Sequence, residues 1–219
     1  LLKAGYPVHV PGVQLNRMCG SGQQAIHFVS QEIASGDMEI GVACGVEMMS
    51  VEKMGKDLPV PAFMKLLGDF PYRLIPQGQS AEKMAQKYGI DRDECDQLAF
   101  ESHRRAGLAR DKGFFDRQTV PFQVCTNKKK KEFTEVYQDE GIRYPPSMAG
   151  IKKLKTVFKK NGVVTAGNAS QITDGASAVL LASAEAVKKF NLNVRARIIS
   201  RAVVGSDPII MLDGVIPAT

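Results

Sequence analysis

Residues 8–46 constrain the fold more than any other part of the chain, because they predict a strand, a turn, a helix and a second strand in succession. Residues 8–18 are rich in β-branched residues, whereas 23–35 places apolar residues at helical spacing and ends at Gly36. Residues 40–46 form a short apolar run, which is typical of a buried strand. A helix between two strands predicts a βαβ unit, and therefore a parallel sheet in an α/β fold.

The rest of the chain predicts a long excursion followed by mixed elements. Residues 50–78 have no clean period and read as a surface segment interrupted by four prolines, Pro59, Pro61, Pro71 and Pro76. Asp91 with Glu94 is typical of a capping box that opens a helix ending near Gly113. The other expected elements are a helix at 81–88, a hairpin at 120–136, a helix carrying Ile151, Leu154 and Phe158, a strand buried on both faces at 176–182, a helix at 183–190 capped by Ser183, and a strand at 195–204.

Composition excludes several classes of protein. The 219 residues are 44% hydrophobic and 24% charged, which disfavours disorder, and no apolar run approaches the roughly 18 residues of a membrane span. The four cysteines have no CxxC spacing, so we expect neither a metal site nor a disulfide framework. The net charge is +6, and its densest cluster is the lysine run 128–131. No aromatic residues interleave with these lysines, which favours a solvated hairpin tip over nucleic-acid binding and leaves an anionic cofactor with several phosphates open.

Cys19 is the candidate nucleophile. It lies among glycines at the expected start of a helix, where free backbone N–H groups stabilise a thiolate and could hold an oxyanion. The alternative is a buried structural cysteine in a strand–helix turn, which is our interpretation of the other three cysteines. No base is identifiable, because His27 lies eight residues on, or roughly 12 Å along a helix, and His9 and His103 are also distant in sequence.

Four motifs in this sequence resemble those of the thiolases, the acetyl-CoA C-acyltransferases. Residues 16–25, NRMCGSGQQA, resemble the nucleophile motif of that family, and 45–50 resemble its GGxExMS segment with Cys44 in place of the first glycine. Residues 164–170 and 174–176 resemble VTAGNxS…DGA, and 207–218 resemble DPxxMxxGPxPA. The VTAGNxS…DGA pattern disfavours the related condensing enzymes of fatty acid and polyketide synthesis, which also use a cysteine at a helix start.

The resemblance implies an α/β thiolase fold with α/β/α layers, here incomplete. Residues 1–50 and 160–190 would belong to the N-terminal half, 51–159 to a loop domain inserted in it, and 191–219 to the start of the C-terminal half. The first strands of the family and most of its second half have no counterpart in this sequence. We therefore expect a piece of a longer protein, with apolar surface exposed on the sheet of the first half.

The activity that the resemblance implies is acyl transfer between CoA thioesters, in either the thiolytic or the condensing direction, as in fatty acid β-oxidation. Cys19 would carry the acyl group, while the family's GHP, NEAF and CxGG motifs, which supply a histidine, an asparagine and a second cysteine, do not occur here. We therefore expect negligible turnover by the 219 residues alone. The alternative is a truncated, non-catalytic protein that binds CoA or acts as a partner subunit.

Coenzyme A is expected as a substrate, with no permanently bound cofactor. By motif position the residues that would contact it are Arg143, Phe158, Ala166, Ser170 and Met211. An ion pair with Asp139 or Glu140 is the alternative for Arg143, and core packing is the alternative for Phe158. Leu212, Asp213 and Val215 stand where the family has a glycine, a small or polar residue and a proline. Pro76 and Gln77 stand where many members have His-Met. The full-length protein would be a homodimer or homotetramer with no membrane span, in the cytoplasm or alternatively in an organelle.

Overall fold

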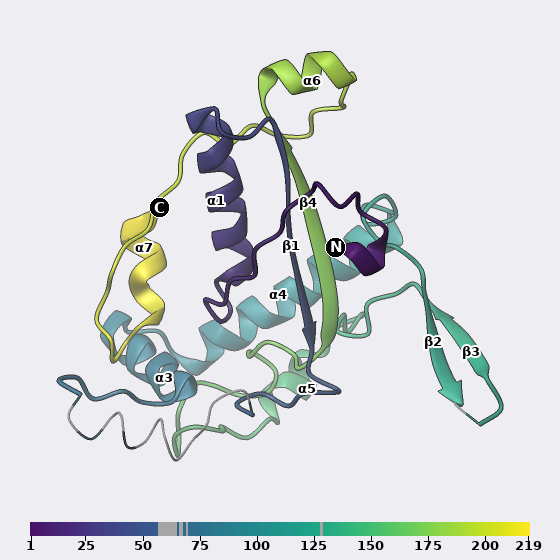
Figure 1. Cartoon of the computed structure of the whole chain (residues 1–219). Helices are drawn as coiled ribbons and strands as arrows, with labels where there is room; N and C mark the ends of the chain where they lie inside the picture. Colours follow the sequence, from purple (N-terminus) through teal and green to yellow (C-terminus); the bar gives the residue numbers. More distant parts are fainter. Residues whose placement is uncertain (57–64, 66–67, 69, 128) are drawn as a thin grey trace. The chain divides into compact units, whose positions relative to one another are not determined.

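The computed structural model of the chain describes residues 1–56, 65, 68, 70–127 and 129–219 (Figure 1). Pro59 and Pro61 of the expected surface excursion, and Lys128 of the lysine run, lie outside the described residues. The chain forms two compact units, one of Leu1–Lys65 with Ile172–Val203 and the other of Leu66–Gln171 with Val204–Thr219. The expected division into family halves and a loop domain stays a prediction.

The first unit is built on a pair of long strands beside a helix. The strands are β1 (Ile40–Met48) and β4 (Asp174–Ala182), which run antiparallel with Ile40 opposite Ala182 and Met48 opposite Asp174 (Figure 1). The helix is α1 (Ser21–Ser35), which ends at Gly36 with φ of 88°. A short turn of 3-10 helix, η1 (Leu2–Ala4), and α6 (Ala184–Phe190) complete the unit. Ser183 caps α6 by accepting the N–H of Ala186, as expected.

Helix α1 covers only one face of this sheet. Because side chains alternate along a strand, Ala43 and Leu181 share the face toward α1, where both are buried. Val42, Val46 and Leu180 share the opposite face and are 41%, 72% and 57% exposed. The expected apolar exposure on this sheet is therefore present. The expectations of a buried strand at 40–46 and of a strand buried on both faces at 176–182 are wrong.

The predicted parallel sheet is also wrong. Among the described residues, 8–16 and 195–204 form no strand, so the helix α1 does not join two paired strands. Pro11 lies inside the first of these segments and lacks the N–H group that a strand ladder needs. The sequence pattern of β1 identified a strand but carried no information on its partner, which is β4, more than 120 residues later in the chain.

The second unit contains two of the expected helices, although the first begins four residues before the expected 81–88. Helix α3 (Gln77–Tyr88) ends at Gly89, and α4 (Arg92–Asp111) begins with the capping box of Asp91 and Glu94. The predicted hairpin is present as β2 (Phe122–Asn127) and β3 (Glu132–Val136). Two short elements near the C-terminus are η3 (Leu212–Gly214) and α7 (Val215–Ala218).

Helix α5 (Met148–Lys152) is shorter than expected. Of the three residues that suggested it, only Ile151 lies in the helix, whereas Leu154 and Phe158 follow it. The chain turns away because Thr156 forms a β-bridge with Thr165, and the N–H of Val157 donates to the carbonyl of Val164 at 3.0 Å. No helix in the described part of the chain is both long and apolar enough to cross a membrane.

Candidate active site

Cys19 is exposed in the turn that leads into α1. Local hydrogen bonds fix this turn from both sides. The N–H of Arg17 donates to Ser21 Oγ at 2.8 Å, and Ser21 Oγ in turn donates to the carbonyl of Met18 at 2.6 Å. The side chain of Asn16 accepts the N–H of Met18 at 2.8 Å. The motif residues around Cys19 therefore hold the thiol in a defined turn.

The backbone beside Cys19 has two unusual features. Met18 has a φ of 49°, which is a strained conformation for a residue with a side chain and is frequent at functional sites. Within the described part of the chain, the N–H groups of Gly22 and Gln23 donate to no acceptor. Free N–H groups at a helix start attract negative charge, which is the arrangement that an oxyanion needs. The predicted setting of Cys19 is confirmed at the helix start, although no strand precedes it.

The other cysteines lack this setting. Cys44 lies in the middle of β1, and Cys125 lies in β2. Burial raises the pKa of the Cys95 thiol, and the nearby Asp96 carboxylate acts in the same direction. A raised pKa disfavours the thiolate that a nucleophile needs. In the part of the chain that the structure describes, no group of histidine, cysteine and acidic side chains could hold a metal ion.

The histidines supply no visible base. His27 is buried in the middle of α1, and its Nδ1 has no hydrogen-bond partner among the described residues. His9 lies in the irregular segment upstream of Cys19. His103 lies in α4, where its Nδ1 accepts the N–H of Arg143 at 3.3 Å. None of these contacts links a histidine to the thiol of Cys19.

In the second unit, the VTAGNxS segment forms a loop fastened by buried polar groups. The carboxylate of Glu82 in α3 is buried and accepts the N–H of Val163 at 3.0 Å and of Val164 at 2.9 Å. Asn168 accepts the N–H of Thr165 at 2.9 Å and donates to the carbonyl of Val163 at 2.8 Å. It also donates to Asp96, which is fully buried, at 3.3 Å. This network presents Ala166 and Ser170 on the surface, where both are exposed.

Phe158 and Met211 both lie near the first turns of α3. The Phe158 ring rests against Gly78, where a β-carbon would collide with it, and is 44% exposed. Two residues along the helix, the Oγ of Ser80 donates to the carbonyl of Ile209 at 2.6 Å. Met211 follows closely, with a strained φ of 43° and 39% exposure. The Phe158 ring therefore packs against α3 on one side and is exposed to solvent on the other.

Arg143 is exposed and holds its place through its backbone. Among the described residues its side chain forms no ion pair, and the Asp139 carboxylate instead accepts the N–H of Gly141 at 2.6 Å. The alternative of an Arg143 ion pair is therefore not observed. Sequence reasoning missed the roles of Glu82 and Asn168, although a carboxylate on the apolar side of a helix is a signal that could have identified Glu82.

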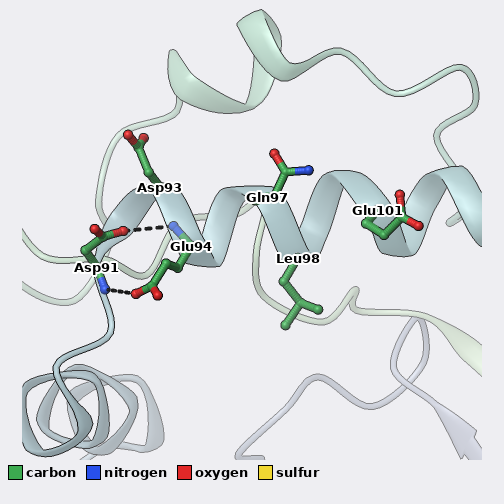
Figure 2. Close-up of a pocket in the computed structure, with 6 residues that line it drawn as sticks. All are labelled: Asp91, Asp93, Glu94, Gln97, Leu98 and Glu101. Atoms are coloured by element: carbon green, nitrogen blue, oxygen red, sulfur yellow. Dashed lines mark hydrogen bonds between the residues drawn. The ribbon is translucent and has the colours of Figure 1, made fainter.

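The shallow hollow shown in Figure 2 does not contain the predicted site. It is lined by six residues from the N-cap to the middle of α4, namely Asp91, Asp93, Glu94, Gln97, Leu98 and Glu101. Four of these carry carboxylates, which repel phosphate groups. The capping-box hydrogen bonds drawn in Figure 2 explain why Asp91 and Glu94 lie there. The cluster fits helix capping rather than CoA binding.

Fold and site together define an α/β protein with a cysteine exposed in the turn before a helix. A family model described as the thiolase N-terminal domain matches residues 1–185. The chain is 40% identical to the mitochondrial 3-ketoacyl-CoA thiolase of Mus musculus, over 99% of this chain and 57% of that relative. It is also 40% identical to the peroxisomal 3-ketoacyl-CoA thiolase of Homo sapiens, over 97% of this chain and 50% of that relative.

Solved structures agree with these relatives. The crystal structure of human mitochondrial 3-ketoacyl-CoA thiolase superposes with a TM-score of 0.83 at 38% identity, covering 99% of this chain and 57% of that one. The same protein in complex with CoA gives a TM-score of 0.70 at 38% identity, covering 87% and 49%. The chain belongs to the thiolase family and spans about half the length of the curated relatives it matches. The α/β thiolase fold expected from the sequence is thereby confirmed.

Proposed function

We propose that this protein takes part in acyl transfer between CoA thioesters, with the sulfur of Cys19 as the nucleophile. The Cys19 thiolate attacks the 3-keto carbonyl of a 3-ketoacyl-CoA. The bond between the α- and β-carbons then breaks, and the departing acetyl-CoA carbanion takes up a proton. The acyl group remains on Cys19 as a thioester. The thiolate of a second CoA attacks this thioester, releases the shortened acyl-CoA and restores the Cys19 thiolate.

The proposal rests on the hydrogen-bonded turn that holds Cys19 at the start of α1. This turn combines an exposed thiol, a strained residue before it and two free N–H groups after it. Free N–H groups at a helix start can hold the oxyanion that forms when the sulfur attacks a carbonyl. The alternative of a non-catalytic CoA-binding or partner protein has no such observation behind it.

We also propose that CoA is bound as a substrate, with no permanently bound cofactor, by Arg143, Phe158, Ala166, Ser170 and Met211. The exposure of Arg143, Ala166 and Ser170 supports this assignment, as does the partial exposure of Phe158 and Met211. The net charge of +6 suits a ligand that carries several phosphates. The relative solved in complex with CoA supports the same ligand class.

At the level of the whole enzyme, the proposal is a 3-ketoacyl-CoA thiolase of fatty acid β-oxidation that assembles as a homodimer or homotetramer. The names of the relatives place those proteins in mitochondria and in peroxisomes. These names support an organelle, the alternative that stood beside the cytoplasm in the sequence analysis. The same proposal includes negligible thiolase turnover by the 219 residues alone, because none of their histidines forms a hydrogen bond with Cys19.

The test is to find which cysteine carries an acyl group. The 219-residue chain is incubated with excess acetoacetyl-CoA, digested under acidic conditions and analysed by mass spectrometry. We expect slow, stoichiometric acetylation of Cys19, and its loss in Cys19→Ser. Cys44→Ser is the matched control, because Cys44 is also exposed but lies in a strand. Equal labelling of both cysteines, or labelling of neither, would refute Cys19 as the nucleophile.

A further inference from the structure

Helix α3 fastens two different segments that the proposed CoA site uses. Ser80 and Lys87 are seven residues apart, which places them on the same side of a helix. Both bond to the segment that contains Met211. Glu82 lies on another side of the helix and bonds to Val163 and Val164. The position of Met211 relative to the 163–170 loop is thus set through α3.

The contact of Lys87 with Asp213 is the second of the two attachments on the Met211 side. Lys87 Nζ donates to Asp213 Oδ2 at 2.8 Å, with side-chain exposures of 46% and 11%. The Tyr88 hydroxyl donates to the same oxygen at 3.5 Å. The hydrogen bond from Lys87 holds the pKa of Asp213 below its ordinary value, so the carboxylate is charged at neutral pH. An ion pair with one partner largely buried is harder to replace with water than an exposed pair.

The segment between these two attachments is a strained turn. The carboxylate of Asp207 accepts the N–H of Ile209 at 2.7 Å, and its carbonyl accepts the N–H of Met211 at 2.7 Å. Met211 itself has a φ of 43°. A residue in this conformation persists only where its surroundings hold it. Ser80 holds the turn before Met211, and Lys87 holds it after Met211 through Asp213.

We propose that Lys87 and Asp213 are positioning residues that keep Met211 in place for binding of the pantetheine part of CoA. This inference rests on the proposed CoA site. The pattern DPxxMxxGPxPA specifies no residue at the position of Asp213, so the motif itself does not require the pair. Without the pair, the turn is held only at its Ser80 end, and the binding-competent position of Met211 becomes a minor population.

The test is binding of CoA to the 219-residue chain, measured by calorimetry in reducing buffer. We expect Lys87→Met and Asp213→Asn each to weaken CoA binding roughly five- to tenfold, as for a protein whose competent state is partly depopulated. Lys87→Arg keeps the charge and should restore most of the affinity. Amide hydrogen exchange, measured without CoA, should be faster at 209–214 in the first two variants and close to the original rate in Lys87→Arg.

The matched control is Lys189→Met, which removes a lysine from the exposed ion pair with Glu39 in the other unit. It should change neither CoA affinity nor exchange at 209–214. Two results overturn the inference in different ways. If the original chain binds CoA and Lys87→Met binds it equally well, the positioning role is wrong while the CoA site stands. If the original chain binds no CoA, the proposed site itself is wrong, and the inference falls with it.

Discussion

The side chain of Asn168 fastens its own loop and joins that loop to α4. It accepts the N–H of Thr165, and donates to the carbonyl of Val163 and to the buried Asp96. We expect Asn168→Ala to lower the free energy of unfolding by about 1–3 kcal/mol, because partly buried groups lose their partners. Urea unfolding measures this change. The exposed Asn193 is the control, and an Asn168→Ala chain no less stable than Asn193→Ala would contradict the prediction.

Glu101 makes a pH-dependent contribution to stability. Hydrogen bonds from two arginines lower the pKa of Glu101 from 4.5 to about 2, and the bond from Arg104 has a larger effect than the bond from Arg105. A lowered pKa in the folded state means that the stabilisation is complete above the unfolded value and is lost as the pH falls toward the folded value. The difference in unfolding free energy between the original chain and Glu101→Gln should therefore shrink as the pH falls from 4.5 toward 2.

Titration of the Glu101 carboxyl group by NMR gives a direct measurement of the same effect. Glu52→Gln is a suitable control, because its ion pair with Lys56 is longer, at 3.9 Å, and both side chains are 61% exposed. The difference in unfolding free energy between the original chain and Glu52→Gln should change less with pH than the difference for Glu101→Gln. A Glu101 midpoint close to that of an isolated glutamate would show that the two arginines do not hold the carboxylate in solution.

The sequence predicted the helix start beside Cys19 because the signals for it are local. The turn of Cys19 depends on its neighbours, such as Asn16 and Ser21, so the glycines and the helix start were enough to identify it. Glu82 and Asp213 act on segments about 80 and 125 residues away. No local pattern shows such partners, and they became visible only when the folded chain brought them together.

Among the elements, helix α4 offers the clearest test of a local signal. The Asp91 side chain accepts the N–H of Glu94 at 2.8 Å, and the Glu94 side chain accepts the N–H of Asp91 at 2.9 Å. We expect Asp91→Ala to lower the free energy of unfolding by about 1 kcal/mol, as the loss of an N-cap usually does. Asp91→Asn keeps an acceptor and should be nearly as stable as the original chain. Equal losses in both variants, measured by urea unfolding, would contradict a capping role.

Helices were predicted better than strands for a physical reason. The helices α1 and α3 close their hydrogen bonds within themselves, and their ends are marked by Gly36 and Gly89 in left-handed conformations. A strand needs a partner that its own sequence does not name. The segment 195–204 alternates like a strand but pairs with nothing among the described residues, whereas β1 pairs with a distant and antiparallel β4.

At the scale of the whole molecule, the chain assembles into units that do not follow its sequence order. The C-terminal residues Val204–Thr219 belong to the second unit rather than to the one that holds Ile172–Val203. The attachments of Ile209 to Ser80 and of Asp213 to Lys87 explain this return to α3. The expected start of a second family half at 191–219 therefore spans parts of both compact units.

The uncovered face of the β1–β4 sheet should govern how the chain behaves in solution. Val42, Val46 and Leu180 lie together on it, and apolar patches of this kind bind dyes and other apolar surfaces. We expect the 219-residue chain to enhance the fluorescence of an apolar dye and to self-associate with rising concentration in sedimentation experiments. Replacing Val46 and Leu180 together with threonine should lower both signals, because it interrupts the patch. Val8→Thr is the control, since Val8 is 91% exposed outside the sheet, and a monomer that binds no dye would contradict the prediction.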